Sequence, residues 1–177
     1  MRLVLILVAT PAAAAPYREP DDWKRESGIT ADLGAGYSGL TALAGNHSGI
    51  GADTKAIHLD GAIGAFLAPG LATQLRVSLA TPVVDTVPQV TAGAITLGLR
   101  TDIPNTGLYS FIGLGLAVGI DHMTSDSHYG TAWDWRFGIK LPSATEHTLT
   151  ISVGLTLGKY GDGWLSDYGI ALGYQHR

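Results

Sequence analysis

Aspartate and histidine side chains that could bind a metal ion lie close together in one polar stretch of the sequence. They are Asp121, His122, Asp126 and His128, and zinc sites in proteins use these residue types. Their spacing matches none of the patterns that form a closed zinc site. We therefore expect a polar loop over His122–His128 with solvated side chains, and the sequence predicts no metal site.

A glycine pattern that occurs in dinucleotide-binding proteins runs from Gly34 to Gly39. Such a GxGxxG pattern binds a pyrophosphate when a strand precedes it and a helix follows it. Here it lies within a segment of alternating apolar and small residues and leads into a stretch rich in Gly, Ala and Asn. The sequence therefore predicts no cofactor-binding site.

Charged residues also occur inside segments that are otherwise apolar, on the side opposite the Leu, Ile and Val residues. Charges kept away from water must pair or form hydrogen bonds. Asp60 and Arg76 would lie diagonally across a hairpin that turns at Pro69, within reach of each other. We predict a structural salt-bridge network, and the alternative is a gated polar channel with space left by glycines such as Gly113 and Gly154. The expected members of the network are Asp32, His58, Asp60, Arg76, Arg100, Asp134, Arg136 and Lys140.

The segments that carry these residues have a period of two, which indicates strands with one apolar face and one small or polar face. The clearest is Thr106–His122, where large apolar residues alternate with glycine and alanine. The same pattern predicts further strands at about 29–39, 55–67, 71–80, 89–101, 129–141, 147–158 and 168–176. Longer and shorter connections alternate between them, and the last longer one is a loop over Lys159–Asp167.

Eight alternating strands predict an all-β fold, an eight-stranded antiparallel up-and-down barrel, and the polarity of its faces decides between two environments. A soluble ligand-carrying barrel places its charges outside, whereas a transmembrane barrel faces lipid with its apolar residues. Only 15% of the residues are charged, and the other face, made largely of Gly, Ala and Thr, would be a poor soluble exterior. We therefore predict a transmembrane barrel. The residues expected in its aromatic girdles are Tyr37, Tyr129, Trp133, Trp135, Tyr168 and Tyr174.

The first residues predict export. Arg2, the apolar run Leu3–Val8 and the small residues Ala12–Ala15 are typical of a signal peptide. We expect a signal peptide at 1–15, a polar lead-in at 16–27 and the barrel domain at 28–177. The chain has no cysteine and a formal net charge of −4, so we expect no disulfide and no nucleic-acid partner.

With this pattern of strands, faces and connections, residues 28–177 resemble the small eight-stranded outer-membrane β-barrels, the class of the OmpA transmembrane domain, OmpX and OmpW. The resemblance lies in the pattern and in no sequence motif. It implies a location in the outer membrane, with outer-membrane lipid and the barrel-assembly machinery as partners. The assembly machinery of that class reads an aromatic residue at the end of the last strand. Tyr174 is the counterpart here, and the final Arg177 departs from the pattern.

The resemblance also implies an enzymatic alternative, because some small outer-membrane barrels modify lipid A. The deacylases use a His and a nearby Ser on a lipid-facing strand, and no His-x-Ser occurs here. The palmitoyltransferases use His, Asp and Ser near the outer loops, which His47, Ser48 and Asp53 would supply. We predict no catalytic residues and a structural or surface-interaction role. The alternatives are a small channel or carrier of apolar molecules and a lipid A-modifying enzyme.

Overall fold

The computed structural model describes residues 28–44, 54–83, 90–103, 106–121, 125–141, 147–161 and 163–176. The predicted signal peptide and lead-in lie outside these ranges, as do His47, Ser48, Asp53 and His122. The described strands are β1 (Ile29–Ala44), β2 (Thr54–Ala68), β3 (Leu71–Pro82), β4 (Val90–Asp102), β5 (Leu108–Asp121), β6 (Ser127–Lys140), β7 (His147–Tyr160) and β8 (Gly163–His176). In the described ranges no helix is long and apolar enough to cross a membrane.

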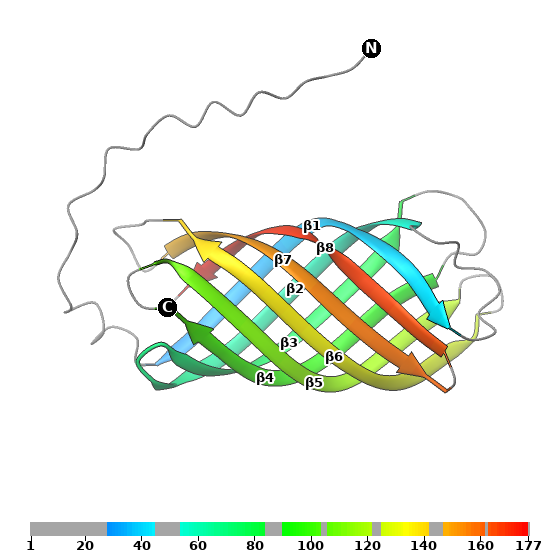
Figure 1. Ribbon diagram of the computed structural model, residues 1–177, viewed down its shortest axis with the longest axis horizontal. Helices are drawn as coiled ribbons and strands as arrows, with labels where there is room; N and C mark the ends of the chain where they lie inside the picture. Colours follow the sequence, from blue (N-terminus) through cyan, green and yellow to red (C-terminus); the bar gives the residue numbers. More distant parts are fainter. Residues whose placement is uncertain are drawn as a thin grey trace, which may run out of the picture.

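The strands form one closed antiparallel barrel in which each strand pairs with the next and β8 pairs back with β1 (Figure 1). The closing seam runs from Ala31 opposite His176 to Ala44 opposite Trp164. The predicted fold class, an all-β eight-stranded barrel, is therefore confirmed. Closure leaves no strand edge unpaired, so the backbone groups of the described strands are satisfied within the sheet.

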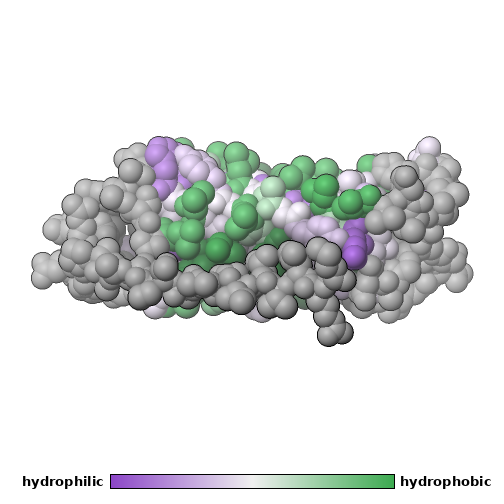
Figure 2. Space-filling view, turned by 90° about the horizontal axis from the view of Figure 1, so that it is seen from above, coloured by the Kyte–Doolittle hydropathy of each residue, from purple (hydrophilic) through white to green (hydrophobic). Residues whose placement is uncertain are grey.

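The outer surface of the barrel is apolar. At mid-height Leu97 lies between Leu75 and Leu114 on the neighbouring strands, and these side chains are 61%, 46% and 59% exposed. On the face shown in Figure 2 hydrophobic residues cover much of the described surface, and the most hydrophilic residues lie towards the two ends. A water-soluble protein rarely exposes so continuous an apolar band, whereas a bilayer solvates it.

Several predicted boundaries are wrong at one end of the barrel, where β1 extends to Ala44, five residues beyond its expected end. Residues Lys159–Asp167 were expected to form a loop, but β7 extends to Tyr160, β8 begins at Gly163, and residues 161–162 alone connect them. The reason is that β8 pairs on both sides here, Tyr160 with Gly163 and Trp164 with Ala44. Gly161 has a φ of 57°, which glycine adopts without a steric cost and which a tight hairpin turn requires.

The two ends of the barrel differ. We call the loop end the one with the connections 45–53, 83–89, 122–126 and 161–162, and the terminal end the one where β1 begins and β8 ends. The terminal end carries the connections 69–70, 103–107 and 141–146. Figure 1 shows the start of β1 and the end of β8 at the same end of the barrel.

One glycine shows how closely the strands approach each other. A Cβ added to Gly115 would collide with the carbonyl oxygen of Ile95 on β4 and lie 2.7 Å from the Cα of Thr96. A Cβ on Gly93 would meet no described atom closer than 3.5 Å.

We predict that Gly115→Ala lowers the free energy of unfolding by about 1–3 kcal/mol, the usual cost of overpacking. Gly93→Ala is expected to be neutral or stabilising, because alanine has less conformational freedom in the unfolded chain. Urea unfolding in detergent micelles, followed by circular dichroism, measures both. Equal losses in the two variants would contradict the steric explanation.

Candidate functional site

The candidate site is the barrel interior, or lumen, where polar side chains from six strands meet. These side chains point inward because each lies on the face of its strand opposite the exposed Leu, Ile and Val residues. We call them the lumen network: Asp32, His58, Asp60, Gln74, Arg76, Arg100, Asp102, Asp134, Arg136, Lys140, Asp167 and Gln175.

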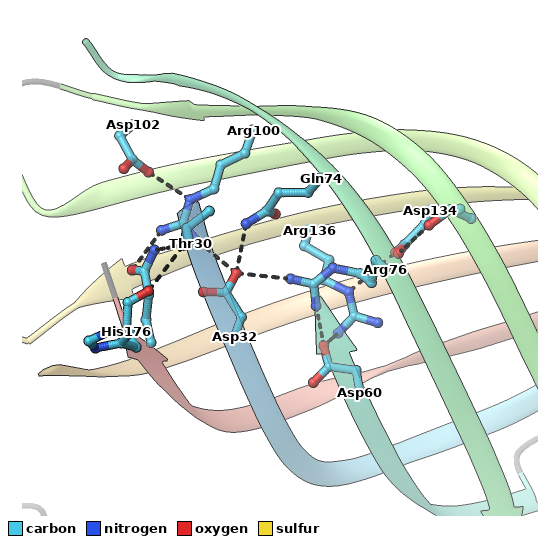
Figure 3. Close-up of polar contacts among 12 residues, drawn as sticks. Thr30, Asp32, Asp60, Gln74, Arg76, Arg100, Asp102, Asp134, Arg136 and His176 are labelled. Carbon is cyan, nitrogen blue, oxygen red and sulfur yellow. Dashed lines mark hydrogen bonds and ion pairs between the residues drawn. The ribbon is translucent and has the colours of Figure 1, made fainter. Parts of the chain in front are cut away.

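Arg100 organises the part of the network nearest the terminal end (Figure 3). Its Nε donates to Asp102 Oδ1 at 2.9 Å, one terminal nitrogen donates to Asp32 Oδ2 at 2.9 Å, and the other donates to Gln175 Oε1 at 3.0 Å. The guanidinium also lies over the ring of Tyr109, 4.2 Å from its centroid. With 1% of the residue exposed, Arg100 ties β4 to β1, β5 and β8.

Neighbouring groups extend this cluster across the lumen. Lys140 Nζ donates to Asp102 Oδ2 at 2.7 Å, and Gln74 Nε2 donates to Asp32 Oδ2 at 2.9 Å. Gln175 Nε2 donates to Thr30 Oγ1 at 3.1 Å. Both oxygens of the Asp102 carboxylate therefore accept from cations on different strands.

A second cluster occupies the middle of the lumen. Asp60 forms ion pairs with Arg76 and, at 2.8 Å, with Arg136. Arg136 Nε also donates to Asp134 Oδ1 at 3.3 Å. Arg76 lies 3.8 Å from Asp32 and 5.2 Å from the centroid of the Phe111 ring, so it joins the two clusters.

An imidazole–carboxylate pair completes the network towards the loop end. His58 Nδ1 donates to Asp167 Oδ2 at 2.7 Å, and the other ring nitrogen accepts from Arg136 at 3.0 Å. This pattern requires neutral His58 with its proton on Nδ1. Since both nitrogens are engaged, His58 has no free nitrogen with which to take a proton from a nucleophile in this arrangement.

Beyond this pair the lumen lining becomes small and apolar. Leu40, Tyr160 and Leu165 are buried here with a group of alanines. A cavity lined by Ser78, Thr156, Tyr160, Leu165 and Asp167, among others, has room for about one water molecule. The lumen therefore has a charged, filled part towards the terminal end and a small-residue part towards the loop end.

The structure places all eight residues of the predicted interior set in the lumen. The expected diagonal contact between Asp60 and Arg76 is present as an ion pair. Asp32 and Lys140 reach different partners, Arg100 and Asp102.

The sequence-based set omitted four members of the network. Asp102 was taken for part of a turn and Asp167 for part of a loop, and Gln74 and Gln175 were assigned to the inner face without a partner. A signal for Asp102 was present, because it follows Arg100 by two residues and so shares its face.

The aromatic residues predicted for the girdles all lie on the outer surface and are 41–74% exposed. Tyr129 is the third residue of β6 and lies at the loop end, whereas Trp135 is the ninth of 14 and is paired with Leu155 in the middle of β7. Trp135 therefore lies within the apolar band, deeper than a girdle residue. Tyr174 lies near the terminal end, where its ring stacks on His147 and its hydroxyl contacts the His147 imidazole.

The residues that could have bound a metal or cofactor do not form a site in the described part of the chain. Asp121 ends β5, and its amide donates to the carbonyl of Asp126 at 3.0 Å, while His128 lies in β6 opposite Gly119. No group of three or more potential metal ligands occurs among the described residues. The glycine pattern Gly34–Gly39 lies inside β1, which continues as a strand to Ala44.

Comparison with known proteins identifies the fold. No family model matches the sequence, and no curated protein matches it. Among solved structures, the chain is similar to Neisserial surface protein A, with 9% identity and a TM-score of 0.65 over 85% of this chain and 97% of that one. It is also similar to Ail, the attachment invasion locus protein of Yersinia pestis, with 12% identity and a TM-score of 0.58 over 82% and 97% of the two chains.

A further structure of Ail, described as an outer membrane protein and determined in a phospholipid bilayer nanodisc, matches with 12% identity and a TM-score of 0.50 over 84% and 99% of the chains. These similar structures are small eight-stranded outer-membrane barrels. The fold implied by the resemblance in sequence pattern is therefore confirmed.

Proposed function

We propose that this chain is an integral outer-membrane barrel with a structural or surface-interaction role and a closed lumen. Its exposed apolar band, its closed sheet and the outer-membrane setting of the barrels it is similar to support the location. The loop end, with the long connections 45–53 and 83–89, faces the outside. The terminal end, which holds both described ends of the chain, faces the periplasm, as is usual for transmembrane barrels.

The observation that carries the closed lumen is the continuity of the lumen network. Its contacts run from Lys140 through Asp102, Arg100 and Asp32 to Arg76, and onward through Asp60 and Arg136 to His58. The interior of an eight-stranded barrel is only wide enough for side chains to fill it. Arg100 and Phe111 are fully buried across it. A water path would require several of these ion pairs to separate together.

We predict that the wild-type barrel and its Arg76→Ala variant show no stepwise conductance in planar lipid bilayers. In the variant Asp60 keeps Arg136 as a partner, and Phe111 still fills the middle of the lumen. A conducting porin measured in the same bilayer is the positive control. Stepwise openings of the wild-type barrel would contradict the closed lumen.

A gated channel is the second candidate, and the small-residue lining towards the loop end favours it. Alanines line this part beside Tyr160 and Leu165, and its cavity already has room for about one water molecule. If the wild type stays closed while Arg76→Ala conducts, the clusters act as a gate and the channel hypothesis replaces the structural one. Closed traces for both proteins favour the structural role.

A further inference from the structure

Three side chains form a cluster on the outer surface of the barrel near the loop end. The rings of Trp133 on β6 and Trp164 on β8 are stacked, with centroids 5.1 Å apart and planes 19° from parallel. Lys159 on β7 places its ammonium over the Trp164 ring, 5.6 Å from the centroid. Lys159 and Trp164 are direct partners across the β7–β8 ladder. We call these three residues the Trp–Lys cluster.

The cluster lies where the apolar band ends. Lys159 is the second-last residue of β7 and Trp164 the second residue of β8. Nearer the middle of the barrel, the outward residues of β7 are apolar, among them Val153 and Ile151. The cluster thus occupies the level at which bilayer hydrocarbon gives way to headgroups.

Lys159, like Lys55, is exposed on the outer face, whereas the other Lys and Arg residues described in the strands turn inward. The side chains of Arg76, Arg100, Arg136 and Lys140 turn into the lumen and pair with aspartates there. Lys159 is exposed on the outer face, and its described contact is the face of an indole. A cation on the lipid-facing surface is costly at mid-membrane and is tolerated near the interface, where anionic headgroups lie.

The chemistry of the cluster fits a phosphorylated sugar. An ammonium group binds phosphate as a compact positive charge, and a cation–π contact holds it in place. Trp133 is 41% exposed and so offers an apolar surface beside the ammonium, with the polar tip that tryptophan presents at a membrane interface. A glycolipid headgroup that carries both a phosphate and a sugar ring would meet the lysine and the aromatic surface together.

We propose that the Trp–Lys cluster binds the phosphorylated glucosamine headgroup of an outer-leaflet glycolipid of the lipid A type. This inference rests on the proposed function, because it requires that the loop end face the outer leaflet. It gives the outer surface of β6–β8 a lipid-recognition role in addition to the general affinity of aromatic residues for the interface.

The test is a titration of the full-length mature barrel, refolded in zwitterionic detergent, with diphosphoryl lipid A, followed by tryptophan fluorescence and native mass spectrometry. Lys159→Gln is expected to weaken binding about tenfold, the equivalent of one charge-assisted contact. Enzymatically dephosphorylated lipid A should bind the wild type about as weakly. Trp164→Leu should lower the affinity in the same direction, because it removes the surface that holds the ammonium.

Lys55→Gln is the matched control. Lys55 is also exposed at the loop end, but it lies on β2 opposite Gly39, with no indole across the ladder. The Lys55→Gln variant should keep an affinity for lipid A within about twofold of the wild type, a difference of roughly 0.4 kcal/mol. Equal losses for Lys55→Gln and Lys159→Gln would overturn the proposal, because they would show attraction to surface charge alone.

Two further results would also overturn the site: unchanged binding in Lys159→Gln, or equal competition by phosphatidylglycerol, which carries a phosphate but no sugar. Failure of the proposed function has a different signature. In that case the wild-type barrel would not insert into vesicles or show heat-modifiable migration on gels. If the barrel inserts normally but does not prefer diphosphoryl lipid A, the result contradicts the proposed site and leaves the proposed function standing.

Discussion

Replacing Arg100 with methionine is expected to lower the free energy of unfolding by about 3–5 kcal/mol, the cost of breaking a buried ion pair by removing one partner. Methionine keeps much of the apolar length of the side chain but none of its donors. Asp32 and Asp102 would each lose a hydrogen bond of 2.9 Å, and Gln175 would lose one of 3.0 Å. The barrel seam would be affected directly, since Asp32 and Gln175 are register partners across β1 and β8.

Unfolding in urea, with the barrel in detergent micelles, measures this loss through the shift of the transition midpoint at constant slope. Arg100→Lys is the conservative comparison and should recover part of the stability, because it retains the charge but cannot donate to three acceptors in one plane. Asp102→Asn combined with Arg100→Met should cost less than the two single losses added together. A loss below about 1 kcal/mol for Arg100→Met would show that water replaces the guanidinium and that the lumen is hydrated.

The inward and outward faces were predictable because a strand has a period of two and the barrel separates two environments. Arg76, Arg100 and Arg136 could be assigned to the lumen from their position opposite the Leu, Ile and Val residues. The same reasoning extended by two residues would have included Asp102. It was missed because Pro104 and the asparagine after it indicate a turn, and the strand was ended at Thr101.

The start of β8 could not be predicted from local pattern. Gly161 and Gly163 are typical of a loop, and the segment that follows buries Leu165 on the lumen side, where most strands place small or polar residues. Pairing with β1 on one side and β7 on the other holds this segment in the sheet. Asp167, and with it the partner of His58, was therefore missed.

Specific partners within the lumen depend on closure of the barrel. His58 and Asp167 are 109 residues apart in sequence, and Arg100 and Gln175 are 75 apart. These side chains meet because β8 pairs with β1 at one particular register. A shift of that register would bring different residues together, and alternation along each single strand carries no information about it.

The lipid-facing assignment of the outer surface makes a prediction of its own at Leu97. This side chain is 61% exposed at mid-height of the barrel, between Leu75 and Leu114. Leu97→Arg is expected to lower the free energy of unfolding in lipid vesicles by about 2–4 kcal/mol, because an arginine facing the bilayer midplane must be hydrated or displaced towards the interface. Val83→Arg, just beyond β3 at the loop end, should cost only about 0–1 kcal/mol, because headgroups and water lie within reach there.

Reversible unfolding of each variant in phosphatidylcholine vesicles, with guanidinium as denaturant, gives the two values. Their difference is more informative than either alone, because both substitutions place the same side chain at an exposed position. A soluble barrel would give the opposite result: its outer face would meet water, and arginine at Leu97 would improve solubility without a loss of stability. Equal costs at the two positions would contradict a bilayer around the middle of the barrel, whereas a larger cost at Leu97 follows only if the medium there has a much lower polarity than at Val83.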